Sequence, residues 1–258
     1  MSAPLLSAAG ISRTYSSGGR RVVALDNASI AVARGETLGL VGPSGSGKST
    51  LARILLRLIE PDAGRVDFDG VDLLSLRGEK LRATRRRIQM VFQEPLAAFN
   101  PRATVGGALA DPLRIHGIAA PSERPAAVAH LLERVGLDPG LASRAIHEIS
   151  GGQRQRVAIA RAIATKPDLI VLDEAVSALD VSVRAKVLEL LVGLQRERGI
   201  AYIFVSHDLA VVRAISHHIA IMDAGRIVEH GPAPDIVADP QSAAGRALVA
   251  AVPRLVLK

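Results

Sequence analysis

Residues 42–50 read GPSGSGKST, and this stretch decides the fold because of what lies on either side of it. The run before it, Thr37–Val41, is short and mostly apolar, as expected for a buried strand. After it, four apolar residues recur at the i, i+3, i+4, i+7 spacing of a helix with one buried face. They are Leu51, Ile54, Leu55 and Leu58. Residues 37–58 therefore predict a strand, a glycine-rich loop and a helix in direct succession.

The loop fits the pattern G-x-x-x-x-G-K-[ST], which binds phosphate groups when it lies between a strand and a helix. Small side chains let successive backbone N–H groups surround the phosphates, and the helix N-terminus adds the positive end of its dipole. We expect Lys48 to reach the β- and γ-phosphates of a nucleotide and the Ser49 hydroxyl to bind Mg²⁺. The residues expected at the phosphates are Gly42, Ser44, Gly45, Ser46, Gly47, Lys48, Ser49 and Thr50.

Two carboxylates follow another predicted strand. Leu169–Leu172 is a continuous apolar run, as expected for a strand covered on both faces, and Asp173 and Glu174 come directly after it. Ligands of parallel sheets bind at the carboxyl ends of the strands. We therefore expect Asp173 to hold Mg²⁺ through water and Glu174 to orient and deprotonate an attacking water. Without the phosphate loop, such a pair would more often mark a simple turn.

A second candidate anion site is Ser150-Gly151-Gly152-Gln153. These residues open a predicted helix that continues through Arg156 and Arg161. A serine hydroxyl, two glycines and a helix N-terminus can bind an anion. On general physics the same residues could form only a capped helix start.

The middle of the chain changes from strand to helix signals. Between about Asn100 and His147 no strand pattern occurs, and four apolar residues repeat the helical spacing after a start signal at Pro121-Ser122. These four are Val128, Leu131, Leu132 and Val135. We interpret residues 94–153 as an inserted all-helical unit.

Strands and helices alternate on both sides of this insertion. The predicted strands before it, besides Thr37–Val41, are Val22–Leu25, Ala28–Val32 and Arg65–Phe68. After it, a helix with apolar positions at Val187, Leu190, Leu191 and Leu194 ends at Gly199. The strand Ile200–Val205 and a hairpin of His218–Met222 with Ile227–Glu229 follow. The pattern predicts an α/β fold, with a core of residues 1–93 and 154–258 in one domain spanning 1–258.

The composition excludes several classes of protein. The 258 residues are 48% apolar and 22% charged, so a disordered chain or a coiled coil is not expected. The absence of cysteine excludes disulfide scaffolds, thiol catalysis and cysteine-ligated metals. No apolar run is long enough to span a membrane, and no basic segment precedes an apolar run at the N-terminus. We expect a cytosolic globular protein, and its net charge of +7 is scattered with few aromatic residues, which favours solubility over nucleic-acid binding.

The phosphate loop, the SGGQ segment and LIVLDEAVSALD at residues 169–180, in this order, resemble the ATP-binding subunit of an ABC transporter. The resemblance covers nearly the whole chain. It implies an ATPase that uses ATP and Mg²⁺, with a P-loop NTPase (RecA-like) core, an N-terminal antiparallel β subdomain and an inserted helical signature subdomain at 94–153. It also implies a head-to-tail dimer in which Ser150-Gly151-Gly152-Gln153 of one copy closes over the ATP of the other.

The resemblance assigns further residues. Tyr15 matches the aromatic residue that stacks on adenine, although it could also be a strand residue that covers the sheet. Gln93 matches a glutamine that contacts Mg²⁺ and the attacking water, and it begins a loop that responds to the membrane partner. Asp180 matches a residue of the dimer seam, and His207 matches the histidine at the γ-phosphate. The resemblance thus implies the catalytic residues Glu174, His207 and Gln93, and the metal-binding residues Ser49, Gln93 and Asp173.

Several segments resemble importers of dipeptides, oligopeptides and nickel. They are residues 88–95 (IQMVFQEP), 99–105 (FNPRATV), 111–117 (DPLRIHG), 225–229 (GRIVE), 239–241 (DPQ) and 247–253 (ALVAAVP). Ile149 and Ala175 depart from the commoner leucine or phenylalanine and proline, and Ser242-Ala243-Ala244 replaces a usual His-Pro-Tyr. The resemblance implies ATP-driven import of peptides, or alternatively of nickel. Its implied partners are membrane permease subunits, a second ATPase copy of the same or a related chain and, indirectly, an extracytoplasmic binding protein. The expected location is peripheral, on the cytoplasmic face of the inner membrane.

Other functions remain open at this point. An ABC ATPase acting on DNA or the ribosome would usually show a coiled-coil insertion, zinc-binding cysteines or two ATPase cores, so no nucleic-acid partner is expected. A binding module with an inactive ATP site is disfavoured because Lys48, Ser49, Asp173, Glu174 and His207 are all present. An exporter is compatible with the chemistry alone, and only the segments of the preceding paragraph favour import.

Overall fold

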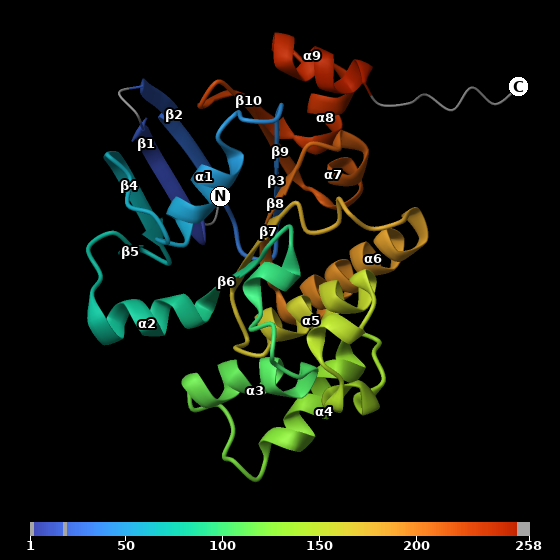
Figure 1. Ribbon diagram of the computed structural model, residues 1–258. Helices are drawn as coiled ribbons and strands as arrows, with labels where there is room; N and C mark the ends of the chain where they lie inside the picture. Colours follow the sequence, from blue (N-terminus) through green and yellow to red (C-terminus); the bar gives the residue numbers. More distant parts are fainter. Residues whose placement is uncertain (1–2, 18–19, 252–258) are drawn as a thin grey trace, which may run out of the picture.

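The computed structural model describes residues 3–17 and 20–251, which form two β-sheets with helices around them (Figure 1). The central sheet has the order β10-β9-β3-β8-β7-β6. Its strands from β9 to β6 are parallel, and β10 pairs antiparallel to β9. The bounds are β3 (Thr37–Val41), β6 (Ile88–Val91), β7 (Leu169–Asp173), β8 (Ala201–Ser206), β9 (His218–Asp223) and β10 (Arg226–Pro232).

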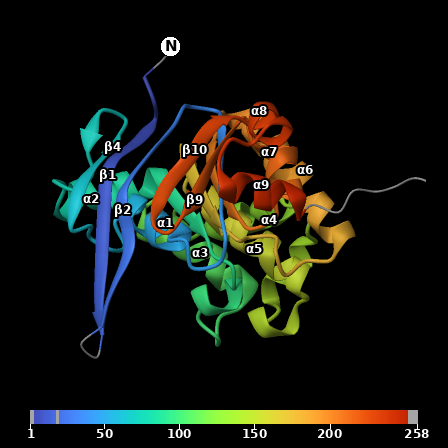
Figure 2. The same cartoon turned by 90° about the horizontal axis from the view of Figure 1, so that it is seen from above.

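The N-terminal sheet is antiparallel, with the order β2-β1-β4-β5. Seen from above, β1 and β2 run side by side along one flank, and α7, α8 and α9 lie on the opposite flank (Figure 2). The bounds are β1 (Leu6–Ser17), β2 (Arg20–Val32), β4 (Ala63–Phe68) and β5 (Val71–Asp72). The predicted strands Val22–Leu25 and Ala28–Val32 were wrong as separate elements. Asn27 adopts a left-handed φ of 54°, and the pairing with β1 shifts register there, so one irregular strand continues through both.

The helices between and after the strands cover both faces of the central sheet. Their bounds are α1 (Lys48–Leu55), α2 (Gly78–Arg87), α3 (Val105–Ile115), α4 (Arg124–Arg134), α5 (Gly151–Ile163), α6 (Val181–Arg198), α7 (Leu209–Ile215), α8 (Ala233–Ala238) and α9 (Ala243–Ala250). Short 3-10 helices are η1 (Pro95–Ala98), η2 (Pro139–Ser143) and η3 (Ile146–Glu148). Figure 1 shows α3 and α4 at the end of the molecule away from the N-terminal sheet.

Successive residues of each central strand point to opposite faces of the sheet and enter two separate apolar cores. In β7, Leu169 and Val171 pack into a core that α1 shares with the N-terminal sheet. Ile170 and Leu172 pack into the other core, with α5, α6 and α7. The continuous apolar run of β7 thus reflects cover on both faces, as the sequence predicted.

Two local predictions were wrong. Leu58 does not extend the buried face of α1, because the helix ends at Leu55 and the Leu58 residue is 52% exposed. Helix α4 begins at Arg124 rather than at Pro121-Ser122, and its first turn contains Pro125. Proline is tolerated there because the first N–H groups of a helix have no partner within it.

The predicted boundary between residues 153 and 154 falls inside the first turn of α5. The division into a core and a helical subdomain remains a prediction. In the tail, Val252 and Pro253 of the importer-like segment lie outside the described residues. Among the helices of residues 3–17 and 20–251, none combines the length and the apolar character needed to cross a bilayer.

We predict that Tyr202→Phe lowers the free energy of unfolding by about 1 kcal/mol, because the buried Tyr202 hydroxyl donates to the Leu191 carbonyl oxygen at 3.0 Å. The measurement is a urea titration, with a lower midpoint at an unchanged slope. The matched control is Tyr15→Phe, since the Tyr15 side chain is exposed and should lose little. Equal midpoints for all three proteins would contradict the prediction.

Candidate nucleotide-binding site

The glycine-rich loop lies between β3 and α1, at the carboxyl end of the central sheet. The Lys48 ammonium group donates to the carbonyl oxygens of Gly42 (2.9 Å) and Pro43 (2.8 Å), and it lies 3.4 Å from the Ser46 hydroxyl. Lys48 is only 5% exposed, and burial lowers its pKa, while the nearby charges of Glu174 and Asp173 act in the opposite direction. The side chain therefore spans the loop from beneath and places a positive charge under it.

Two features fix the shape of this loop. Gly47 has a φ of 106°, and a Cβ there would collide with the carbonyl oxygen of Ala24, so only glycine fits. The Ser46 carbonyl oxygen accepts a hydrogen bond from Gly225 N–H (3.0 Å), which ties the loop to the β9–β10 turn. As the N-cap of α1, Gly47 offers no side chain to the first N–H groups of the helix. These groups suit a phosphate.

Ser49 and Asp173 meet across the sheet. The Ser49 hydroxyl donates to Asp173 Oδ1 at 3.0 Å, and Asp173 is buried. Burial raises the pKa of Asp173, and the hydrogen bond from Ser49 partly offsets this effect. A hydroxyl, a carboxylate and the nearby amide oxygen of Gln93 are hard oxygen donors of the type that Mg²⁺ prefers. The donor set therefore fits the predicted metal.

Two of the predicted catalytic residues converge on one carboxylate oxygen of the third. Gln93 Nε2 donates to Glu174 Oε2 at 3.1 Å, and His207 Nδ1 lies 3.4 Å from the same oxygen. Glu174 has a φ of 48°, which is costly for a residue with a side chain. Its backbone is fixed by a hydrogen bond from Glu174 N–H to the Val205 carbonyl and by one from the Ser177 hydroxyl to the Glu174 carbonyl. The carboxylate is thus held by the backbone at the end of β7.

A cleft of about 560 Å³ joins most of these residues, and we call it the phosphate cleft. It is lined by Val22, Val23, Ala24, Ser44, Gly45, Gly47, Lys48, Ser49, Thr50, Gln93, Glu174 and His207. An adjoining cavity of about 370 Å³, which we call the metal cavity, shares Ser49 and Gln93 with it and adds Arg53, Phe92, Glu94, Ala98 and Asp173. Gly42 and Ser46 belong to the loop itself and accept hydrogen bonds from Lys48.

Tyr15 is placed next to the phosphate cleft and not in its lining. It pairs in register with Val22, which does line the cleft, and its ring lies 5.1 Å from the guanidinium carbon of Arg13. Val22, Val23 and Arg53 line these cavities, but their sequence pattern did not mark them as site residues. Adjacent valines in a strand read only as strand formers, and their exposure depends on where the N-terminal sheet ends.

Ser150-Gly151-Gly152-Gln153 begins α5 with a reciprocal pair of hydrogen bonds. The Ser150 hydroxyl accepts from Gln153 N–H (3.2 Å), and Gln153 Oε1 accepts from Ser150 N–H (2.9 Å). Gly151 and Gly152 follow Ser150 in the first turn. The segment and Asp180 line a third cleft, of about 650 Å³, which shares no described residue with the phosphate cleft. One chain therefore holds the two predicted anion sites apart.

Asp180 is the N-cap of α6. Its carboxylate accepts from Val183 N–H at 2.9 Å and from the Ser182 hydroxyl at 2.8 Å. The backbone hydrogen bond from Val183 is the main cause that lowers the pKa of Asp180. This capping places an ionised carboxylate in the cleft of the SGGQ segment.

Comparisons with known proteins agree with this geometry. The sequence pattern of the family described as "ABC transporter" matches residues 25–177. The glutathione import ATP-binding protein GsiA of Escherichia coli K12 is 53% identical over 234 residues, and that of Salmonella typhimurium LT2 is 54% identical. Both alignments cover 91% of this chain, which spans only 38% of the length of these relatives.

Solved structures show the same fold. The ATP-binding cassette MJ0796, in a dimeric post-hydrolysis state with ADP and Pi, has a TM-score of 0.81 and 32% identity, over 88% of this chain and 98% of that chain. CbiO1 from Clostridium perfringens, part of the ABC transporter complex cbiONQ, has a TM-score of 0.78 and 28% identity. The match covers 92% of this chain and 91% of that chain. The chain belongs to the ABC transporter family and has the fold of an ATP-binding cassette.

We predict that Ser49→Ala raises the pKa of Asp173 further above its ordinary value of 3.8, because it removes the hydrogen bond that favours the ionised form. Over the pH range above 3.8, a larger fraction of Asp173 is then protonated. The measurement is a carboxyl ¹³C NMR titration. Thr50→Ala, which removes a neighbouring hydroxyl, is the control and should leave the Asp173 titration in place. An unshifted titration in Ser49→Ala would refute the interpretation.

Proposed function

We propose that this chain hydrolyses ATP to drive import through a separate membrane permease. The observation that carries the catalytic part is the convergence of Gln93 and His207 on Glu174, beside Lys48 and Ser49 in one cleft. A carboxylate that is held by its backbone and contacted by two polar side chains suits a residue that must aim at a water molecule.

In the proposed reaction, the glycine-rich loop and Lys48 hold the phosphates, and Glu174 orients the attacking water and accepts its proton. The Gln93 amide fixes the Glu174 carboxylate by its hydrogen bond, and His207 contacts the γ-phosphate. Tyr15 supports the adenine from the edge of the phosphate cleft. Ser49 and Gln93 would hold Mg²⁺ directly and Asp173 through water. The metal would supply positive charge to the phosphate oxygens.

A second cassette completes the site in this proposal. The cleft of Ser150-Gly151-Gly152-Gln153 and Asp180 shares no described residue with the phosphate cleft, so in one chain the SGGQ segment cannot close over its own nucleotide. MJ0796, which has the same fold, is described as dimeric. A head-to-tail pair, formed with a second copy or a related chain, would bring the SGGQ segment to the nucleotide of its partner.

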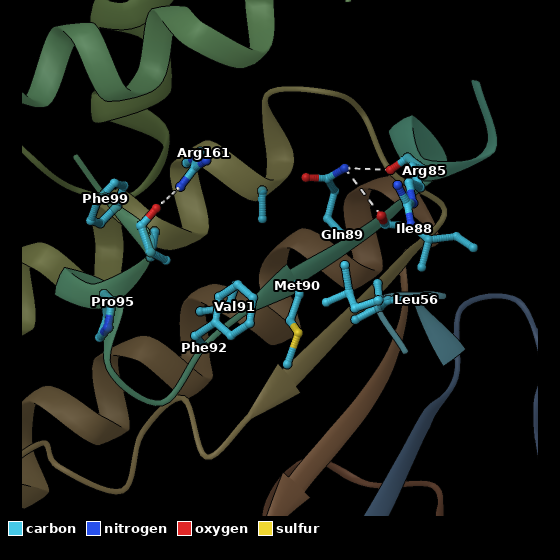
Figure 3. Close-up of a pocket in the computed structure, with 14 residues that line it drawn as sticks. Leu56, Arg85, Ile88, Gln89, Met90, Val91, Phe92, Pro95, Phe99 and Arg161 are labelled. Carbon is cyan, nitrogen blue, oxygen red and sulfur yellow. Dashed lines mark hydrogen bonds between the residues drawn. The ribbon is translucent and has the colours of Figure 1, made fainter. Parts of the chain in front are cut away.

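The permease would dock at an apolar groove of about 300 Å³ beside β6 (Figure 3). Its lining includes Phe92, which directly precedes Gln93, and Pro95 and Phe99, which follow it on the same segment. A permease segment in this groove would therefore contact the loop that carries a catalytic side chain. We propose that the protein binds its permease at the cytoplasmic face of the inner membrane. We further propose that residues 94–153 are the unit that moves on dimerisation.

The transported molecule is proposed to be a peptide. The relatives at 53–54% identity are named for glutathione import, and glutathione is itself a tripeptide. The segments quoted above resemble importers of dipeptides and oligopeptides, and nickel is the alternative in the same branch. An extracytoplasmic binding protein would deliver the molecule.

We predict that Glu174→Gln lowers kcat for ATP hydrolysis about 100- to 1,000-fold, because an amide of the same shape cannot accept the proton. The affinity for ATP, measured by titration with a fluorescent nucleotide, should remain within about threefold. The control is Glu189→Gln, at an exposed position of α6 away from both clefts. Comparable hydrolysis by Glu174→Gln and the unsubstituted chain would exclude Glu174 as the base.

The proposed substrate is tested by uptake in cells that lack this chain, with labelled glutathione, a labelled dipeptide and radioactive nickel measured side by side. Peptide import predicts loss of glutathione or dipeptide uptake with nickel uptake intact. Restoring the chain should restore the uptake, and restoring Glu174→Gln should not. Loss of nickel uptake alone would favour the alternative, and no loss in any arm would remove the support for this branch.

A further inference from the structure

Arg161 lies on α5, eight residues beyond Gln153, and reaches across to the segment that follows β6 (Figure 3). Its Nη1 donates to the Ala98 carbonyl oxygen at 2.8 Å. Its guanidinium carbon lies 5.4 Å from the centre of the Phe99 ring, within the range of a cation–π contact. Phe99 is buried in the core that α5 shares. The Arg161 side chain thus contacts two consecutive residues, namely Ala98 at the end of η1 and Phe99, which is the C-cap of η1.

Residues 92–99, which we call the wall, contribute to the lining of two cavities, and Arg161 holds the C-terminal end of this segment. Phe92 and Ala98 line the groove beside β6. The same two residues also line the metal cavity, together with Ser49, Gln93 and Asp173. The groove and the metal cavity therefore adjoin the same stretch of chain, and Arg161 is hydrogen-bonded to it.

The two ends of this connection both reach functional residues. Gln93 is a residue of the wall, and its side chain donates to Glu174 Oε2 at 3.1 Å. Helix α5, which carries Arg161, begins at Ser150 and the glycines of the SGGQ segment. A helix behaves as a stiff rod over this length. A shift of α5 at its N-terminal end is therefore passed to Arg161 with little loss.

We propose that Arg161 is a positioning residue, which fixes the wall to α5 and so sets where the Gln93 amide lies relative to Glu174. This inference rests on the proposed function and deepens it. When the SGGQ segment engages a nucleotide, α5 and the wall move together through Arg161. When a partner fills the groove, it pushes on the wall, and the hydrogen bond from Arg161 limits how far the wall moves.

The first test measures the position of the wall itself. The chain has no cysteine, so Leu96→Cys gives a single labelling site on η1, at a side chain that is 43% exposed. With a nitroxide spin label there, Arg161→Met should raise the mobility of the label. The control is Arg124→Met, since Arg124 also donates from its guanidinium group to a backbone carbonyl, that of Ala119 (3.2 Å), away from the site. Unchanged mobility in Arg161→Met would overturn the proposal.

The second test measures catalysis. Arg161→Met should lower kcat roughly 10- to 100-fold, because a displacement of about 1 Å at a positioning group has effects of this size. KM for ATP should stay within about twofold, since the phosphate loop is not contacted. Arg161→Lys, which keeps the positive charge near Phe99, should recover part of kcat. An unchanged kcat, with the whole fall in kcat/KM due to a higher KM, would overturn the proposal.

A further variant keeps the test valid if Arg161→Met does not fold. Phe99→Leu keeps an apolar side chain in the core and removes the aromatic partner of Arg161, so it should raise label mobility and lower kcat by a smaller factor. Wild-type mobility and kcat in Phe99→Leu would count against the proposal. If the unsubstituted chain shows no ATPase activity, the proposed function fails, while the label at position 96 still decides whether Arg161 fixes the wall.

Discussion

The hydrogen bond between Ser49 and Asp173 joins residues that are 124 positions apart. The parallel strands of the central sheet bring these two residues together. Ser49 is positioned by the loop after β3, and Asp173 is the last residue of β7. Between these strands runs β8, parallel to both, so all three end at one edge. Each strand is buried on both faces, which fixes the register against sliding. The contact therefore depends on two apolar cores whose buried residues lie outside the lining of the phosphate cleft.

This arrangement is unfavourable for the charges that it concentrates. Burial lowers the pKa of Lys48 and raises that of Asp173, so each side chain is pushed toward its neutral form. Glu174 adds a left-handed backbone in a residue that does not favour it. Such costs are typical of sites that bind a charged ligand, because the ligand supplies the missing partners. The surrounding packing has to offset these costs whenever no ligand is bound.

Much of the fold could be predicted because its signals are local. The apolar runs of β3 and β7, Gly199 at the end of α6 and the turn of the β9–β10 hairpin each reflect the conformational preference of a few residues. The failures arose where tertiary context decides. Leu58 has the correct helical spacing, but α1 had already ended, and Asn27 looked like a break although sheet pairing carried β2 through it. No local pattern distinguishes these cases.

The site divided in the same way. The loop residues and the acidic pair follow from spacing and from the rule that ligands bind at strand ends, because both are properties of short segments. The placement of Gln93 and His207 at one oxygen of Glu174 could not be derived from the residues, since it joins three separate strand ends. Only the resemblance to ABC transporters assigned them. Residues of the groove lie in the importer-like segments 88–95 and 99–105, but the groove itself could not be predicted, because it arises from the packing of β6 against α5.

The wall of residues 92–99 has a consequence for how this cassette can be controlled. The groove and the metal cavity share this segment in their linings, so no relay of residues through a core is needed between them. An occupant of the groove does not overlap the lining of the phosphate cleft. Such a molecule would act as a non-competitive effector, which changes the maximal rate of turnover and leaves the nucleotide free to bind.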